Sequence, residues 1–133
     1  MKIIIIISVF LLILFVSGLS AGDLPTTEVQ NEQLKNAVLT LIESVRGKDD
    51  KRLVSLLQEL DSRTAPAHRP TVSRVHRYLK DMKDTDVKFG STFQQQEKNL
   101  IGIRIIEPIC LDFTFIRIDR KGKEVLLLQA INP

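Results

Sequence analysis

The hydrophobic spacing changes once along this chain, and this change restricts the fold more than any other feature. Up to about Asp84 apolar residues recur every three or four positions, whereas from Val87 onward they alternate with polar ones. The first spacing is typical of amphipathic helices, and the second is typical of strands with one buried face. The sequence therefore predicts a block of helices followed by a block of strands, which is an α+β fold.

The first helix is predicted to run from Glu28 to Val45. Thr27 and Gln30 stand at the spacing of a capping box, and the apolar residues behind them recur at helical steps. Gly47 lies just past the end of this helix and can take the left-handed conformation that closes a helix. A short turn should then lead into a second helix that packs against the first.

Two further helices are expected before the strands begin. Either Asp49 or Asp50 can cap the second helix. Its apolar stripe consists of Leu53, Leu56, Leu57 and Leu60. Residues 61–70, DSRTAPAHRP, contain two prolines and predict a loop or at most one irregular edge strand. The third helix is predicted from about Pro70 to Asp84.

Four strands in an antiparallel meander account for the rest of the chain. Their approximate ranges are 87–94, 100–106, 111–118 and 125–131, with a tight turn at 119–123. Gly122 stands where that turn needs a positive φ. Gly90 and Gly102 lie inside strands and suggest places where the sheet bends.

Strand alternation decides where Asp112 points. Side chains alternate across a strand, so Phe113 and Phe115 share one face and Asp112 lies on the other. Burial of each large apolar side chain is worth about 1.5–3 kcal/mol, which should place the two rings beneath the helices. Asp112 is therefore expected to point outward, and a catalytic role for it is not favoured.

The outward face of the predicted sheet is more apolar than a monomer needs. Its interface candidates are Ile106, Ile116, Ile118, Leu126 and Leu128. Contiguous apolar patches mark interaction sites, and a homodimer through this face would cover it. Alternatively, the N-terminal lead or the loops cover these side chains.

The N-terminus has the features of a secretory signal. Lys2 precedes an apolar block that ends in small residues, with a plausible cleavage point after Ala21. The block is shorter than the roughly 20 residues of a membrane span, although an uncleaved anchor stays an alternative. We expect a secreted, extracellular protein, with a signal peptide at 1–21 and a single domain at 22–133, and no other association with a membrane.

The net charge and the cysteine content restrict the kinds of partner that the sequence predicts. Removing residues 1–21 takes away one of the 19 basic residues and none of the 16 acidic ones, which leaves a net charge of +2. Such a balance does not predict binding to nucleic acid or another polyanion. Cys110 is the only cysteine, so it is either a small buried hydrophobe or the site of an intermolecular bridge. No cofactor or metal motif is found.

The segment ESVRGKDDKRLVSLLQEL carries a resemblance to a known family. Two amphipathic helices joined by this lysine and aspartate turn, a third helix and a bent meander resemble the nuclear transport factor 2-like family, in its small secreted branch. The resemblance implies a cone-like, cystatin-like architecture, with three helices packed on a curved four-stranded sheet and a cavity at the open end. Family members usually carry a short strand between the second and third helices, for which residues 61–70 are poorly suited.

The resemblance implies a cavity that binds a small apolar molecule or a protein partner. The cavity candidates are Tyr78, Phe89, Phe113 and Phe115. Enzymes of this family use a pocket Asp or His together with a Tyr. In this chain Tyr78 could reach the cavity, but His76 is expected to face solvent. The second hypothesis is therefore a degenerate isomerase or lyase, with Tyr78 as its polar group. A third is a module that binds acidic surfaces through Arg63, Arg69, Arg74, Arg77, Lys80, Lys83 and Lys88.

Overall fold

The computed structural model describes residues 24–59 and 64–133, and within these ranges the chain has the α+β fold that the hydrophobic spacing predicts. The helices are α2 (Glu28–Arg46), α3 (Asp50–Ser55) and α4 (Val72–Leu79), with short 3₁₀ turns η1 (Pro66–His68) and η2 (Asp84–Asp86). The strands are β1 (Lys88–Gln95), β2 (Leu100–Glu107), β3 (Leu111–Arg120) and β4 (Lys123–Asn132). The predicted signal sequence, Leu60 and Arg63 lie outside the described residues.

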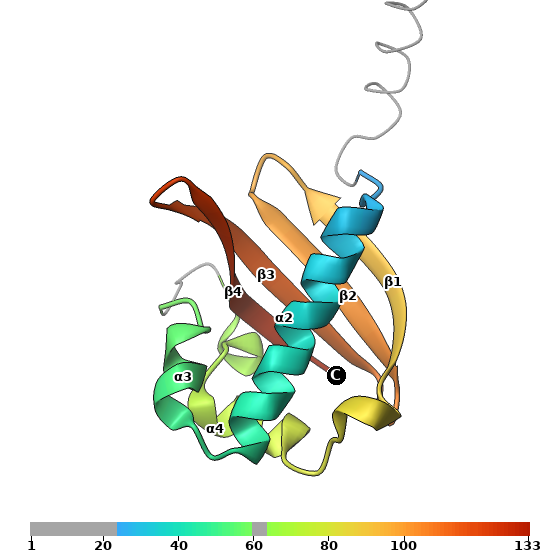
Figure 1. Ribbon diagram of the computed structural model, residues 1–133, viewed down its shortest axis with the longest axis vertical. Coiled ribbons are helices and arrows are strands. Elements are labelled where there is room, and N and C mark those ends of the chain that lie inside the picture. Colours follow the sequence, from blue (N-terminus) through green and yellow to red (C-terminus); the bar gives the residue numbers. More distant parts are fainter. Residues whose placement is uncertain (1–23, 60–63) are drawn as a thin grey trace, which may run out of the picture.

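The four strands form one open antiparallel sheet in the order β1-β2-β3-β4, as expected for a meander. Helix α2 crosses one face of the sheet diagonally, while α3 and α4 lie beside the lower part of that face in Figure 1. The core lies between these layers. On its sheet side Ile101, Ile103 and Ile105 share a face with Leu111, Phe113 and Phe115, as their alternation predicts. This helix-covered side is called the inner face below, and the opposite side is called the outer face.

The capping box of α2 is present, but the helix closes differently from the prediction. Thr27 Oγ1 accepts the amide of Gln30 at 3.1 Å, and Gln30 Oε1 accepts the amide of Thr27 at 2.9 Å. Gly47 has a φ of −78°, and the left-handed conformation falls on Lys48, with a φ of 53°. The prediction for Gly47 was therefore wrong by one residue.

Helix α3 is much shorter than the leucine spacing suggests. Asp49 caps it by accepting the amide of Arg52, but the helix ends at Ser55. The chain then turns alongside β4, where Leu57 forms a parallel bridge with Leu128. Two backbone hydrogen bonds of 2.9 Å flank this bridge. Because an exposed sheet edge offers unpaired backbone groups, pairing with β4 replaces the last helical turn that the sequence suggested.

Helix α4 also ends early, at Leu79 rather than near Asp84. Met82 nevertheless stays in the core, with 3% of its surface exposed, because the chain after α4 continues across the same apolar layer. The proline-containing loop forms η1, which packs against β4. Cys110 is exposed, so the interpretation of this cysteine as a buried hydrophobe was wrong.

A bulge in β1 reverses the expected direction of one aromatic ring. Phe89 pairs with Ile105 and Thr92 pairs with Ile103, so three steps along β1 match two along β2. The extra residue lies beside Gly90, where a bend was predicted. Phe89 therefore packs against the core, whereas Phe93 pairs with Gly102 on the outer face. Strand alternation without a bulge would have placed Phe89 and Phe93 on the same face.

Two of the predicted interface residues were wrong because of a second bulge, in β4. Thr114 pairs with Ala130 and Phe115 pairs with Leu128, which leaves Gln129 as the extra residue. This shift turns Leu126 and Leu128 to the inner face, and Leu128 is fully buried in the core. Neither residue can belong to an interface on the outer face, because one inserted residue reverses every side chain beyond it.

Candidate functional site

A pocket of about 290 Å³ opens between α2 and the hairpin formed by β3 and β4. In Figure 1 the tip of this hairpin lies above α3 and α4, level with the N-terminal half of α2. The apolar lining residues are Ala37, Leu41, Leu56, Phe115 and Leu126, and the polar ones are Gln33, Asn36, Thr40 and Glu124. An apolar floor with a few polar groups at the rim is the usual composition of a small-molecule site.

The local sequence explains both parts of this pocket. Leu41 and Phe115 are each only 1% exposed, so the floor is continuous with the core. Gln33, Asn36 and Thr40 stand at helical spacing on the flank of the apolar stripe of α2, and they supply hydrogen-bonding groups. Ala37 lies between them with the smallest side chain of the stripe, which leaves space above the floor.

The predicted cavity residues are brought into one core but not into one cavity. The rings of Phe113 and Phe115 stack with centroids 6.5 Å apart, and Phe113 is fully buried. Phe89 and Tyr78 pack against the core from its edge. Phe115 is the member of the set that lines the pocket beside α2. The polar residues of α2 were missed, and the signal for them was the small Ala37 inside an otherwise bulky stripe.

A second, polar hollow of about 630 Å³ adjoins the first beyond Glu124, which lines both. The residues lining it are Gln96, Asn99, Arg117, Ile118, Asp119, Gly122 and Glu124. Arg117 lies on the inner face and donates through Nη1 to Gln94 Oε1 at 3.0 Å. Gln94, only 5% exposed, also donates to the Pro25 carbonyl at 2.7 Å. The sequence did not single out either residue.

Asp112 points to the outer face, as the strand alternation predicted. Its partner is Arg104 on the neighbouring strand, whose Nε donates to Oδ1 at 2.7 Å and whose Nη2 donates to Oδ2 at 3.1 Å. The hydrogen bond and the charge of Asp112 raise the pKa of Arg104, with a smaller contribution from Cys110. The carboxylate is thus engaged in a two-point ion pair on the face away from the pocket.

The outer face also carries a block of apolar side chains. Leu100, Ile116 and Leu127 form one rung across three strands, and Ile118 pairs with Val125 in the next. Ile106 lies further along this face, with 47% of its surface exposed. The structure therefore places three of the predicted interface residues, Ile106, Ile116 and Ile118, on the outward side of the sheet.

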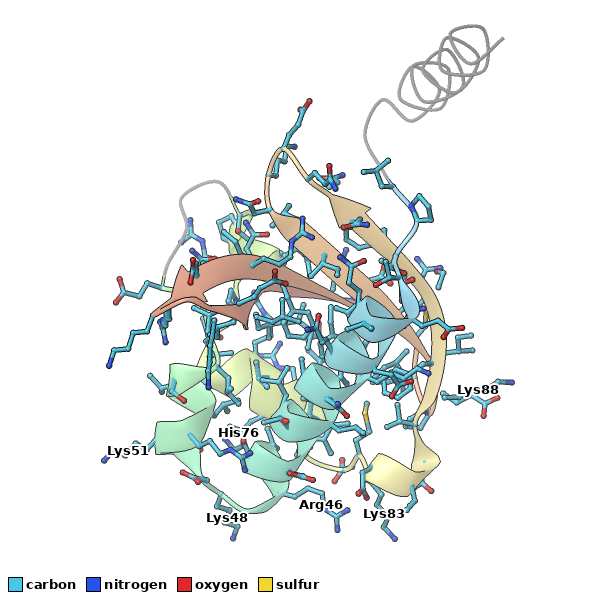
Figure 2. All side chains as sticks on the ribbon, turned by 45° about the horizontal axis from the view of Figure 1, so that its top comes forward. Arg46, Lys48, Lys51, His76, Lys83 and Lys88 are labelled. Carbon is cyan, nitrogen blue, oxygen red and sulfur yellow. The ribbon has the colours of Figure 1, made fainter. Side chains whose placement is uncertain are left out.

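Basic residues gather at the helical end of the molecule, and they overlap in part with the set that the sequence suggested. Figure 2 shows Arg46, Lys48, Lys51, His76, Lys83 and Lys88 at this end. Of these, Lys83 and Lys88 belong to the predicted set. Arg69 and Arg74 are instead used to hold the loop before α4, where Arg74 Nη1 donates to the carbonyls of Pro66 and Arg69. We call the six residues labelled in Figure 2 the basic end.

The two histidines lie apart from the pocket beside α2. His76 is half-buried and its Nε2 lies 2.8 Å from Asp50 Oδ1, so it links α4 to the start of α3. His68 lies beside the outer face, near Asn132 and Ala130. No group of three or more His, Cys, Asp or Glu side chains that could hold a metal ion occurs in residues 24–59 and 64–133. No helix within those ranges is long and apolar enough to cross a membrane.

Comparison with known proteins gives no relative: no family model, curated protein or solved structure matches the chain.

Proposed function

We propose that this chain is a secreted, non-catalytic domain that binds a small, largely apolar molecule in the pocket between α2 and the β3–β4 hairpin. The observation that carries this proposal is the composition of the pocket, whose floor is buried core and whose rim is polar. Its volume of about 290 Å³ lies at the lower end of the roughly 300–1,000 Å³ typical of ligand sites. The ligand is therefore a small molecule, since a larger one would extend beyond this floor.

The nuclear transport factor 2-like architecture is part of the proposal. Two features support it beyond the order of the elements. The helices cover one face of the sheet while β1 and β4 bulge, which bends the sheet around them. The bridge between Leu57 and Leu128 also stands between the second and third helices, where members of that family carry a short strand.

A degenerate isomerase or lyase is the alternative function for the same fold. Such chemistry needs an acid and a base that converge on one substrate. The one ionisable side chain among the residues lining the pocket is Glu124, and Tyr78 is not one of them. This composition favours binding over catalysis.

The basic end supports a further alternative, attachment to an acidic surface. Its side chains come from α2, the following turn, α3, α4, the segment after α4 and the start of the sheet (Figure 2). Asp49, Asp50, Asp84 and Asp86 are interleaved with them and lower the net charge of this end. Because alternating charges attract a polyanion weakly, we rank this function below ligand binding.

For the outer face we propose a second copy of the chain as the partner. A sheet face that carries an apolar block is self-complementary, because a twofold axis brings the same rungs of both copies together. Leu100, Ile116, Ile118 and Val125, the partly exposed members of the block, would form the centre of that contact, whereas Leu127 is only 6% exposed within the single chain. Binding of ligand beside α2 and pairing through the outer face use opposite sides of the sheet and are compatible.

The ligand-binding proposal is tested with the full chain, expressed with its own leader in cultured cells and recovered from the medium. Intact mass should show a chain that begins at Gly22. Titration with octan-1-ol, followed by ¹H–¹⁵N NMR, should shift the amide signals of Ala37, Leu41 and Leu126. Ala37→Met places a longer side chain in the pocket and should abolish these shifts.

Val29→Met is the matched control for this blocking variant. Val29 lies on the same helix, is 69% exposed and does not line the pocket, so its replacement should leave the titration unchanged. Equal titration curves for Ala37→Met and the parent protein would refute binding at this place. Octan-1-ol shifts confined to the outer face would refute it as well.

A further inference from the structure

β4 is the last strand of the open sheet, and part of its free edge is already used by the chain itself. Leu128 donates its amide to the Leu56 carbonyl, and the Leu128 carbonyl accepts the amide of Gln58, each at 2.9 Å. The backbone groups of Leu128 therefore point away from β3. This direction alternates along an antiparallel strand, so it recurs at every second residue of β4 before the bulge at Gln129.

Glu124 and Leu126 are the residues whose backbone groups this alternation directs to the free edge. The turn at Lys121 and Gly122 agrees with the alternation, because both residues have a positive φ and close a two-residue hairpin. In the part of the chain that the structure describes, no other segment pairs with Glu124 or Leu126 on this side. Two amides and two carbonyls are thus available to a further strand, which is how extended peptides add to sheets.

The pocket beside α2 lies directly inward of this edge. Glu124 and Leu126 both line it, together with Leu56, whose carbonyl is bonded to the edge at Leu128. Residues that face each other across two strands direct their side chains to the same face of the sheet. A residue added opposite Leu126 would therefore direct its side chain into the pocket. A volume of about 290 Å³ is enough for one large apolar side chain.

The charges beyond the pocket favour one direction and one composition for the added strand. Antiparallel pairing is slightly more stable than parallel pairing, and an antiparallel strand would run from the pocket toward the hairpin tip. The third residue after the one opposite Leu126 would then face Lys123 on the same side of the sheet. Residues 119–124, DRKGKE, carry three basic and two acidic side chains, so the tip has a net positive charge. An acidic residue is therefore favoured at that place.

We propose that the pocket receives one apolar side chain of an extended peptide that adds to β4 as a fifth strand. The peptide runs antiparallel to β4, places its apolar residue opposite Leu126 and carries an acidic residue three positions later, beside Lys123. Only one side chain enters the pocket, so the size of the pocket limits that side chain and not the peptide. The inference rests on the proposed function for the apolar floor, and it adds the backbone of β4 as a second contact.

The test uses the full secreted chain and the hexapeptide acetyl-Thr-Thr-Leu-Thr-Thr-Glu-amide. In ¹H–¹⁵N NMR the peptide should shift the amide signals of Glu124 and Leu126. Hydrogen exchange at both amides should slow, because they gain hydrogen bonds. The amide of Val125 points toward β3 and should keep its exchange rate. Octan-1-ol should bind without slowing the exchange at either edge amide, because it has no backbone groups.

Two altered peptides separate the backbone contact from the side-chain contact. N-methylation of the leucine removes the N–H that would donate to the Leu126 carbonyl, and it should weaken binding by about fivefold or more. Glycine in place of the leucine leaves the pocket empty, and it should weaken binding by about tenfold or more. In the protein, Ala37→Met should abolish binding of the parent peptide, whereas its matched control Val29→Met should preserve it.

The acidic residue is tested with a third peptide, which has glutamine in place of glutamate. This peptide should bind about two- to threefold more weakly at low salt, which is within the range of an exposed ion pair. Lys123→Gln should remove the difference between the two peptides. Lys88→Gln should preserve it, because Lys88 is an exposed lysine at the helical end of the molecule (Figure 2).

Equal binding of the N-methylated and parent peptides, or unchanged exchange at Glu124 and Leu126, would overturn the strand addition. Peptide binding that survives Ala37→Met would overturn the insertion of a side chain into the pocket. Octan-1-ol binding without peptide binding would overturn the peptide ligand and leave the proposed function standing. Failure of both octan-1-ol and the peptide to bind would overturn the proposed function itself.

Discussion

The ring of Phe93 lies against the backbone of Gly102 on the outer face, where the two residues pair across β1 and β2. A Cβ atom on Gly102 would overlap the ring, and it would also lie 2.8 Å from the backbone oxygen of Phe113. The glycine is therefore needed for the close approach of the ring rather than for an unusual φ. This contact follows from the bulge in β1 that turns Phe93 outward.

Gly102→Ala should destabilise the fold by about 2–3 kcal/mol. The added methyl group must displace an aromatic ring and also approaches backbone, which cannot rotate away, and overpacking of this kind is costly. Urea denaturation followed by circular dichroism measures the change.

Gly90→Ala is the matched control for that substitution. A Cβ there would meet the side chain of Ile106, which is 47% exposed and can move. Its cost should be offset by the lower entropy of the unfolded alanine chain, so the net change should stay under about 1 kcal/mol. Equal destabilisation by the two alanines would contradict the special role of Gly102.

Gln94 connects the segment before α2, which includes Leu24 and Pro25, to the sheet. Loss of its side chain should loosen that connection. Its side chain donates to the Pro25 carbonyl and accepts from both Gln30 and Arg117. Gln94→Ala leaves these partly buried groups unpaired, which should cost about 1–3 kcal/mol of stability. Faster hydrogen exchange at the Leu24 amide, which donates to the Gln94 carbonyl, should accompany the loss.

The exposed Gln96, two residues further along the chain, provides the comparison for Gln94. Gln96→Ala should change the free energy of unfolding by less than about 0.5 kcal/mol. If the Gln94→Ala variant were as stable as the parent protein, the lead would have to be held in another way.

Asp112 should be dispensable for ligand binding, because it lies on the outer face with Arg104. Asp112→Asn removes the charge of the ion pair but touches no residue of the pocket. Octan-1-ol titration should therefore be unchanged, and the small loss of stability should diminish at high salt. Weaker octan-1-ol binding by the Asp112→Asn variant would show instead that Asp112 contributes to the ligand site.

Much of the fold follows from local chemistry that the sequence displays. The capping box at Thr27 and the positive φ of Gly122 each depend on a few neighbouring residues, and both were predicted. Asp49, which caps α3, was one of the two residues expected to do so. The inward direction of Phe113 and Phe115 was predicted because strand alternation is fixed once one face is buried.

The remaining features depend on contacts between distant segments. No local pattern shows that Leu57 will leave its helix, because its partner Leu128 lies on the last strand. The bulge that turns Leu126 and Leu128 inward is likewise decided by the pairing of β3 with β4. The pocket combines a flank of α2 with the far hairpin, so Phe115 was the one residue of its apolar floor that the sequence predicted for a cavity.

The apolar block of the outer face should mediate self-association, and Ile116 is the residue to change. Ile116 lies in the middle of the rung that joins Leu100 to Leu127, so an aspartate there would bring two like charges together across a twofold axis. The parent protein should elute as a dimer at micromolar concentration in size-exclusion chromatography with light scattering, whereas Ile116→Asp should elute as a monomer.

Val54→Asp is the control for this charge substitution. Val54 is the more exposed residue, at 57%, but it lies on α3 at the other side of the molecule, so this variant should remain a dimer. Circular dichroism must show that both variants keep the parent spectrum, because Ile116 is only partly exposed. A parent protein that is monomeric at micromolar concentration would refute the dimer, since the outer face would then be stable in water without a second copy.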